Sequence, residues 1–241
     1  MKVLAFDISS DYAHFRQPYS TTSSLTYAIP PRTAALGIIG AIVGIESGGF
    51  GRSEHVAILE KANTKVGIRL MNKIEKTRFN MNYSYTKADV TTKNVLHIQV
   101  PVEMVRNPVY RLFVTADSEL FEKLEGMVIN SECYYTPYLG ISEFVAKVKY
   151  VKTYEALIVE TADEIWTAIE MLKKTSLSFS SGQKIFTETH AASMNSQRHV
   201  TRYVEVAYEA EGSSLKLQSV DPDSLLAKIP TDAGDEVVML W

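Results

Sequence analysis

The sequence predicts an α+β fold, and the order of its apolar segments carries that prediction. Lys2–Ile8 is a short apolar run that ends at a pair of serines, which is typical of a buried strand. Thr33–Ile45, with Thr33 as its N-cap, and Glu119–Ile129, capped by Asp117 or Ser118, follow as helices. Phe144–Val151 alternates between apolar and polar residues, as a half-buried strand does. Strands and helices therefore alternate along the first part of the chain.

Further strands are expected at His55–Lys61, Lys65–Lys73 and Val109–Thr115. With these, the order fits a ferredoxin-like βαββαβ domain over residues 1–152, the fold that RNA-recognition modules (RRM) use. Residues 74–108 are too many for a plain hairpin loop, so we predict an inserted β-hairpin arm there.

Residues 153–241 form a second unit, which we predict to be a small β-rich C-terminal domain. It would contain a short amphipathic helix at Glu164–Lys173 and strands at Tyr203–Tyr208 and Glu236–Leu240. Nothing in the chain repeats.

The composition is that of an ordinary soluble domain, with 46% hydrophobic and 22% charged residues. The single Cys133 excludes an internal disulfide and a cysteine-based zinc cluster. The longest apolar run, Ala34–Ile45, is too short for a transmembrane helix, which needs roughly 20 residues. The first residues lack a signal-peptide pattern. We therefore expect a cytoplasmic protein without a membrane partner.

Positive charge is concentrated in one segment of this chain, although the net charge is −3. Lys61–Arg111 holds ten Lys and Arg against three acids, whereas Asp117–Glu170 holds eleven acids against four lysines. A basic segment inside an acidic protein indicates a local site for a polyanion. The alternative is a solvated hairpin whose edge lysines prevent aggregation.

The start of the first helix combines a cation with backbone donors. Arg32 stands beside Thr33, where the free N–H groups of a helix N-terminus would bind an anion such as phosphate. Gly37, Gly40 and Gly44 share one helix face, and three glycines there imply a close neighbour, either the sheet or a ligand backbone.

Two segments interleave aromatic rings with cations, as surfaces for unpaired RNA bases do. One is Tyr12–Arg16, in which Tyr12 or Phe15 could instead fill the core. The other lies in the predicted arm. The candidate RNA-binding residues are Tyr12, His14, Arg16, Arg32, Thr33, Gly37, Arg78, Lys87, Lys93 and Arg106.

Catalytic patterns are sparse. The five histidines show no metal-binding spacing, and neither a phosphate-binding loop nor a nucleophile elbow is present, so we expect no metal and no cofactor. His14 and His97 could serve metal-free RNA cleavage, which needs a base and an acid, although a polar surface histidine is the simpler interpretation of each.

One long motif resembles the N-terminal signature of the Cas-five family of CRISPR proteins. It comprises Phe6–Ile8, Tyr12–Tyr19 and Thr26–Gly44, and the later turn Tyr138–Glu143 and the closing Gly234–Trp241 are also similar to that family. Length and motif are most similar to type I-B members. The resemblance implies an RNA-recognition-like core with a protruding thumb, which the basic arm would match.

The resemblance further implies a subunit of the type I surveillance complex, Cascade, that grips the 5′ handle of the guide RNA (crRNA) and caps the assembly. Its partners would be that handle, the backbone subunit and the large subunit. One branch of the family, type I-C, cleaves precursor RNA with a tyrosine and an adjacent lysine and histidine. Here Lys93 and His97 are not adjacent. We therefore predict a non-catalytic RNA-binding subunit, with a metal-independent endoribonuclease as the alternative and an interaction module without an RNA role as a third possibility.

Overall fold

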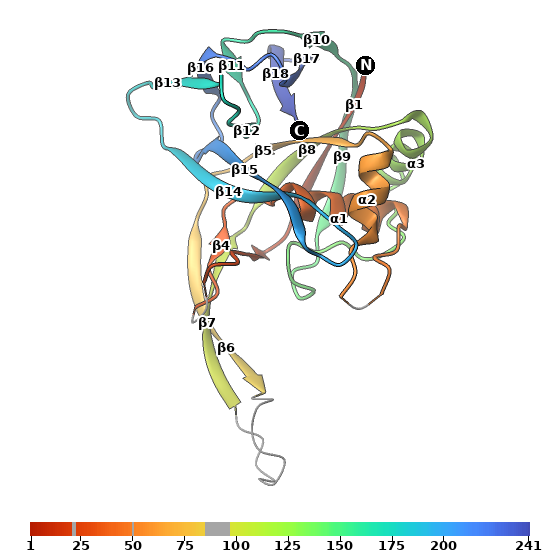
Figure 1. Ribbon diagram of the computed structural model, residues 1–241, viewed down its shortest axis with the longest axis vertical. Coiled ribbons are helices and arrows are strands. Elements are labelled where there is room, and N and C mark those ends of the chain that lie inside the picture. The colour runs from red at the N-terminus through yellow and green to blue at the C-terminus, as the bar shows by residue number, and fades with distance from the viewer. Residues whose placement is uncertain (21–22, 50, 85–96) are drawn as a thin grey trace.

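The computed structural model describes residues 1–20, 23–49, 51–84 and 97–241. In these ranges it contains three helices and many antiparallel strands, arranged as a mixed α/β body from which one long hairpin projects (Figure 1). Among the described residues, each helix is too short or too polar to cross a lipid bilayer.

A four-stranded sheet forms the centre of the body. Its strands lie in the order β5-β8-β1-β9, and each pair is antiparallel. The bounds are β1 Lys2–Ser9, β5 Lys65–Leu70, β8 Val109–Thr115 and β9 Lys147–Glu155. The predicted strands at 2–8, 65–73 and 109–115 are thus present, and the one predicted at 144–151 begins later, because Phe144 belongs to the preceding turn, where its N–H donates to the Ile141 carbonyl.

Each face of this sheet is buried against a different part of the chain. Leu4, Phe6 and Ile8 of β1 belong to a large core that includes the buried residues of the helices. The alternate residues Val3 and Ala5 belong to a smaller core shared with the last strands of the chain. The near-continuous apolar run of β1 follows from this burial on both faces.

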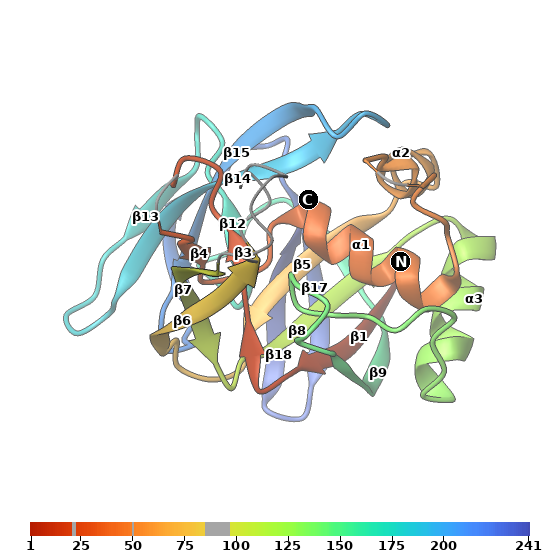
Figure 2. The same ribbon diagram turned by 90° about the horizontal axis from the view of Figure 1, so that it is seen from below.

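Three helices accompany the sheet: α1 Arg32–Val43, α2 Glu54–Lys61 and α3 Ser118–Ile129. Seen from below, α1 crosses in front of the sheet, with α2 and α3 toward one end of it (Figure 2). The two helices predicted at 33–45 and 119–129 are therefore present, with ends that differ by at most two residues.

The predicted arm is a β-hairpin. Strands β6 Lys76–Ser84 and β7 His97–Arg106 pair in antiparallel register from Lys76–Val105 to Ser84–His97 and extend away from the body (Figure 1). Short strands at its base tie it to the core: β2 Tyr12–Ala13 pairs with β7, and β3 Phe15–Arg16 pairs with β4 Thr26–Tyr27.

The remaining strands build three small sheets, in the orders β10-β17-β18, β11-β16-β13 and β12-β15-β14. Their bounds are β10 Leu157–Val159, β11 Glu164–Ile165, β12 Ile169–Glu170, β13 Ser176–Ser178, β14 Ile185–Met194, β15 Val200–Glu209, β16 Leu215–Ser219, β17 Leu225–Thr231 and β18 Gly234–Leu240. The strands predicted at 203–208 and 236–240 lie within β15 and β18.

Two sequence-based predictions are wrong. Residues 55–61 form helix α2 and not a strand, because Val56 and Leu59, its buried residues, are three apart and lie on one helical face. Residues 164–173 form two short strands and not a helix. There the Trp166 and Ala168 N–H groups donate to carbonyls of Val237 and Ile68 on neighbouring strands.

Candidate nucleic-acid interface

A groove runs along the solvent-facing side of α1. It consists of two adjoining clefts of about 740 and 410 Å³, which share Thr33, Ala34 and Gly140 as lining residues. We call the combined feature the α1 groove. It extends from the arm, where Tyr83 near the far end and Val102 nearer the body line it, past α1 to the start of α2.

Small residues form the floor of the groove. Thr33, Ala34, Gly37 and Ala41 of α1 line it, and Thr33, Gly37 and Ala41 follow one another at four-residue spacing, about one turn apart on the same face. The glycine face packs mainly on a side chain of α2 rather than on the sheet. A Cβ at Gly37 would lie 3.6 Å from His55 Nε2, and one at Gly40 would lie 3.4 Å from His55 Cβ.

The walls of the groove carry cations and exposed aromatic rings. Its described lining residues include three arginines and one carboxylate, Glu46. The arginines come from three separate segments: Arg16 from β3, Arg52 from the loop before α2, and Arg198 from the β14–β15 turn. The aromatic lining residues with large exposure are Tyr83, Tyr135, Tyr138 and Tyr203.

This arrangement suits an anionic strand with unpaired bases. Guanidinium groups bind phosphates, and exposed rings offer stacking surfaces to bases. Arg52 also forms an exposed ion pair with Glu54 at 3.2 Å, which costs little to exchange for a phosphate contact.

His14 supports the groove from beneath. Its ring is buried, with Nδ1 2.6 Å from the Glu103 carbonyl oxygen and Nε2 2.9 Å from Ser24 Oγ. Because a carbonyl can only accept, Nδ1 carries the proton, and in the neutral ring Nε2 accepts from the Ser24 hydroxyl. Burial lowers the pKa of His14, and the nearby Arg16 lowers it further, against the raising effect of Glu103.

His55 lines the groove at the start of α2. Burial lowers its pKa, and the charge of Arg198 adds to that effect. A lowered pKa keeps the imidazole neutral near pH 7, so His55 contributes an apolar surface and a hydrogen-bonding nitrogen rather than a charge.

The two sequence motifs quoted above meet at the groove. The backbone N–H of His14 donates to the Leu139 carbonyl at 3.0 Å, and Gly140 lies directly against the His14 carbonyl oxygen. Gly140 also has φ +94°, a conformation that favours glycine. A side chain at this position would collide with the backbone of residue 14.

Arg32 does not face the groove, contrary to the sequence-based expectation of an open phosphate site. Its guanidinium is 4% exposed. Nε donates to the Trp241 carbonyl at 2.9 Å, Nη1 to the Ala192 carbonyl at 2.8 Å and to Glu60 Oε1 at 2.9 Å, and Nη2 to the Thr64 carbonyl at 3.1 Å. The residue connects α1 to four other segments, because Trp241, directly after β18, and the end of β14 lie beside the helix start.

The other predicted residues are distributed over several places. His14, Arg16, Thr33 and Gly37 line the groove. Tyr12 does not, because its ring packs against Phe79 and Phe144 at centroid distances of 5.4 and 5.8 Å.

The RNA-binding residues predicted in the arm do not line the groove either, or lie outside the described residues. Arg78 is 67% exposed, 3.4 Å from Glu103, and lies on the opposite face of β6 from Tyr83, which lines the groove. Arg106 is exposed at the base of β7, opposite Tyr12. Lys87 and Lys93 lie outside the described residues.

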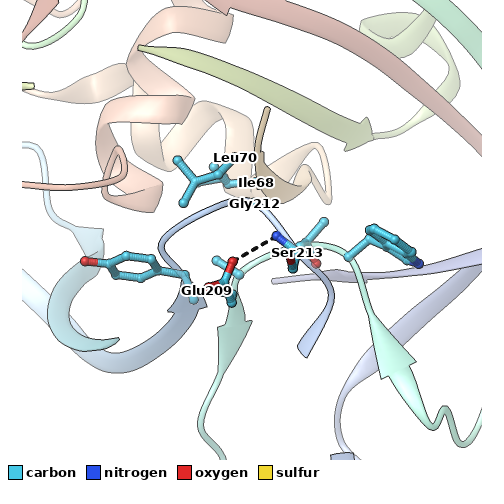
Figure 3. Close-up of a pocket in the computed structure, with 9 residues that line it drawn as sticks. Ile68, Leu70, Glu209, Gly212 and Ser213 are labelled. Carbon is cyan, nitrogen blue, oxygen red and sulfur yellow. Dashed lines mark hydrogen bonds between the residues drawn. The ribbon is translucent and has the colours of Figure 1, made fainter. Parts of the chain in front are cut away.

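A second hollow, near Glu209, is structural. Figure 3 shows it between Leu70 of β5 and the turn at Gly212 and Ser213. Its volume is about 10 Å³, room for one water molecule at most. The buried Glu209 carboxylate accepts from the N–H groups of Lys184, Glu211 and Ser213 at 2.9–3.1 Å. It therefore fixes the turn and offers no space to a ligand.

Sequence reasoning missed Arg52, Arg198, Tyr135 and Tyr138. Two signals could have indicated three of them: Tyr135 lies shortly before the turn Tyr138–Glu143 and Tyr138 begins it, and Arg52 follows a glycine-rich stretch. Arg198 could be identified only from the fold, which brings the β14–β15 turn next to the start of α2. There the backbone N–H of Ser53 donates to the Ser196 carbonyl at 2.9 Å.

The arrangement of helices, sheet and projecting hairpin is a fold found among CRISPR-associated proteins. A crystal structure of a CRISPR protein from Archaeoglobus fulgidus superimposes with a TM-score of 0.61 at 15% identity, covering 99% of this chain and 98% of that one. A chain of a CRISPR RNA-guided surveillance complex gives a TM-score of 0.54 at 13% identity, covering 87% and 90%. At these identities the likeness shows the fold.

The sequence itself establishes the family. Residues 3–211 match the family model described as CRISPR-associated protein (Cas_Cas5), so the chain belongs to that family. No curated protein sequence matches it.

Proposed function

We propose that this protein is the subunit of a CRISPR surveillance complex that holds the 5′ handle of the guide RNA in the α1 groove. The observation that carries the proposal is the convergence of Arg16, Arg52 and Arg198, from three distant segments, on a groove lined by exposed tyrosines. Membership of the Cas_Cas5 family and the fold shared with a chain of an RNA-guided complex support it.

The groove matches the chemistry of single-stranded RNA. The arginines neutralise successive phosphates, and Tyr135 and Tyr138 are exposed stacking surfaces beside them. Gly37, without a side chain, allows the sugar–phosphate backbone to approach α1 closely. Positive charge therefore lies on the walls and small residues on the floor.

The wider architecture is proposed on the same basis. The strand order β5-β8-β1-β9 supports a ferredoxin-like, RRM-like domain over residues 1–152, with residues 153–241 as a C-terminal unit. The hairpin of β6 and β7 serves as a thumb against RNA or against the backbone subunit, and its exposed Phe79, Tyr83 and Ile98 provide the apolar area for that contact. A large subunit is the further partner, and a type I-B complex is the proposed setting.

Charge reversal tests the proposal. The double variant Arg52→Glu, Arg198→Glu should bind handle RNA at least about a hundredfold more weakly than wild type, because each charged hydrogen bond to phosphate contributes about 1.5–3 kcal/mol. Lys123→Glu makes the same kind of charge change at an exposed position on α3, away from the groove, and should bind normally. Equal affinity of the double variant and wild type in filter binding would refute the groove as the RNA site.

A further inference from the structure

A separate cleft lies on the other side of the segment that carries the first aromatic motif. It has a volume of about 770 Å³ and is bounded by Tyr19, by Lys73 and Lys76 where the chain enters the arm, and by the bases of β14 and β15. Among the described residues it shares no lining residue with the α1 groove. We call it the lysine cleft.

The lysine cleft has an aromatic wall. Phe186 of β14 is 52% exposed, and its ring stacks on that of Tyr208 of β15 at 6.1 Å with an interplanar angle of 26°. Tyr19 presents a second exposed ring. Burial and the neighbouring Glu188 raise the pKa of Tyr208, so its phenol stays neutral. The Phe186 ring therefore packs on Tyr208 with one face and leaves its other, exposed face available for stacking.

The charge around this wall is positive. Lys73, Lys76 and Lys184 line the cleft against two carboxylates, Glu188 and Glu211. The Glu188 carboxylate already accepts from the Ala28 N–H at 3.2 and 3.3 Å and lies 3.0 Å from His190 Nε2.

Two lysines of the cleft also lower the pKa of the Glu211 carboxylate. Lys184 donates to it at 2.8 Å and lowers its pKa most, and the exposed Lys73 lowers that pKa further. Lys76 donates to the Thr26 carbonyl at 2.7 Å and lies 3.4 Å from Glu103, so Lys73 is the cleft lysine that no ion pair among the described residues engages.

We propose that the lysine cleft binds one unpaired nucleotide of the RNA, with its base stacked on Phe186 and its phosphate beside Lys73 and Lys184. An aromatic face beside clustered cations recognises a nucleotide, whereas an apolar peptide would leave Lys73 without a counter-charge. This inference rests on the proposed function, since it concerns RNA that leaves the α1 groove.

The backbone connects the two sites. Arg16 and Pro18 line the α1 groove, whereas the intervening Gln17 and the next residue, Tyr19, line the lysine cleft. Consecutive residues of one short segment thus face opposite sides, and a strand that leaves the groove at Arg16 meets the cleft after crossing this single segment. The cleft therefore extends the RNA path around the base of the arm.

Photo-crosslinking of the full chain tests the inference, with a short unstructured oligoribonucleotide that carries 4-thiouridine as the probe. We expect crosslinks in the peptide that contains Phe186, and about a tenfold loss of these crosslinks in Phe186→Ala and in Lys73→Glu. Phe179→Ala removes a ring that is 78% exposed and does not line the cleft, so it should crosslink like wild type.

The outcomes separate the two proposals. Crosslinks confined to groove peptides, with wild-type affinity in Phe186→Ala and Lys73→Glu, would overturn the lysine cleft and leave the groove intact. Wild-type affinity in Arg198→Glu, together with the absence of crosslinks in groove peptides, would instead overturn the proposed function. Loss of crosslinks to the peptide that contains position 186 in Phe186→Ala and Lys73→Glu, with wild-type crosslinking in Phe179→Ala, supports the inference.

Discussion

The guanidinium of Arg32 donates from Nε to the main-chain carbonyl oxygen of Trp241 at 2.9 Å, across 209 positions of the chain. The same side chain contacts Glu60, Thr64 and Ala192, so the start of α1 is tied to α2, to the turn after it, and to β14 and β18. Glu60 in turn accepts from the Ser193 hydroxyl at 3.0 Å. The floor of the α1 groove is therefore held in place by a hydrogen-bonded network around the buried Arg32.

Arg32→Ala should destabilise the protein by about 3 kcal/mol or more, because it removes the charged donor that three carbonyls and a carboxylate share at a buried position. Urea unfolding measures the change. The matched control is Arg78→Ala, at a 67% exposed position, which should alter the free energy of unfolding by less than about 1 kcal/mol. An Arg32→Ala variant of wild-type stability that binds RNA poorly would instead restore the phosphate role expected from the sequence.

Gly140→Ala should destabilise the protein by more than about 1 kcal/mol. A Cβ there collides with the His14 carbonyl, and the residue has φ +94°. Gly126→Ala is the matched control, because Gly126 lies within α3 and its Cβ would meet open space. There alanine should stabilise the helix by about 0.5–1 kcal/mol. Thermal unfolding of the two variants should shift in opposite directions, and a shared direction would contradict this account.

Much of the fold could be predicted from the sequence, because local patterns determine it. The apolar run of β1, the helical spacing of the apolar residues of α3 and the length of residues 74–108 each carry a local signal that the structure retains. Residues 164–173 show the limit. Their apolar spacing is compatible with a helix, and the choice between helix and strand is made by hydrogen bonds to strands distant in sequence.

The candidate site was less accessible to sequence reasoning for the same reason. Arg32 looks like a free cation until the fold brings the carbonyls of Ala192 and Trp241 to it. Arg52 and Arg198 carry no shared motif, yet tertiary packing places them in one groove. Motifs identify residues near the site, but the burial of each side chain is a property of the whole chain.

The stability of the protein should decrease as the pH falls below about 6.5, the ordinary pKa of histidine. His14 and His55 both have pKa values lowered by burial, so the unfolded chain binds protons that the folded chain does not. Their stabilising contribution is present above the unfolded pKa and is lost as the pH falls through the folded pKa. Urea unfolding at several pH values measures this trend.

The variant His55→Gln should weaken this pH dependence, because it removes one of the two titrating groups. His199→Gln, at an exposed position in the β14–β15 turn, is the control and should leave the dependence unchanged. Identical pH profiles for wild type and His55→Gln would show that His55 contributes nothing to the linkage.

RNA binding should weaken with salt, and groove variants should weaken that dependence. For single strands, log K falls with log salt by about 0.7 for each phosphate neutralised. Arg198→Ala should therefore reduce the slope by about 0.7, whereas Lys123→Ala on α3 should not change it. The slopes come from filter binding over a salt series. An affinity that is constant across the series would exclude phosphate contacts as the basis of binding.

The purified protein should not cleave a repeat-containing RNA, with or without EDTA. Metal-free cleavage needs a base and an acid within hydrogen-bond reach of the scissile phosphate. Of the described residues that line the α1 groove, none is lysine, and His14 is buried with both ring nitrogens engaged. His97 begins β7 at the far end of the arm, paired with Ser84, and is not one of the described residues that line the groove. His55 is the histidine best placed to act as a base, since it lines the groove and its lowered pKa keeps it neutral. Specific cutting at one position, abolished by His55→Ala and retained in His199→Ala, would establish the endoribonuclease and replace the non-catalytic role.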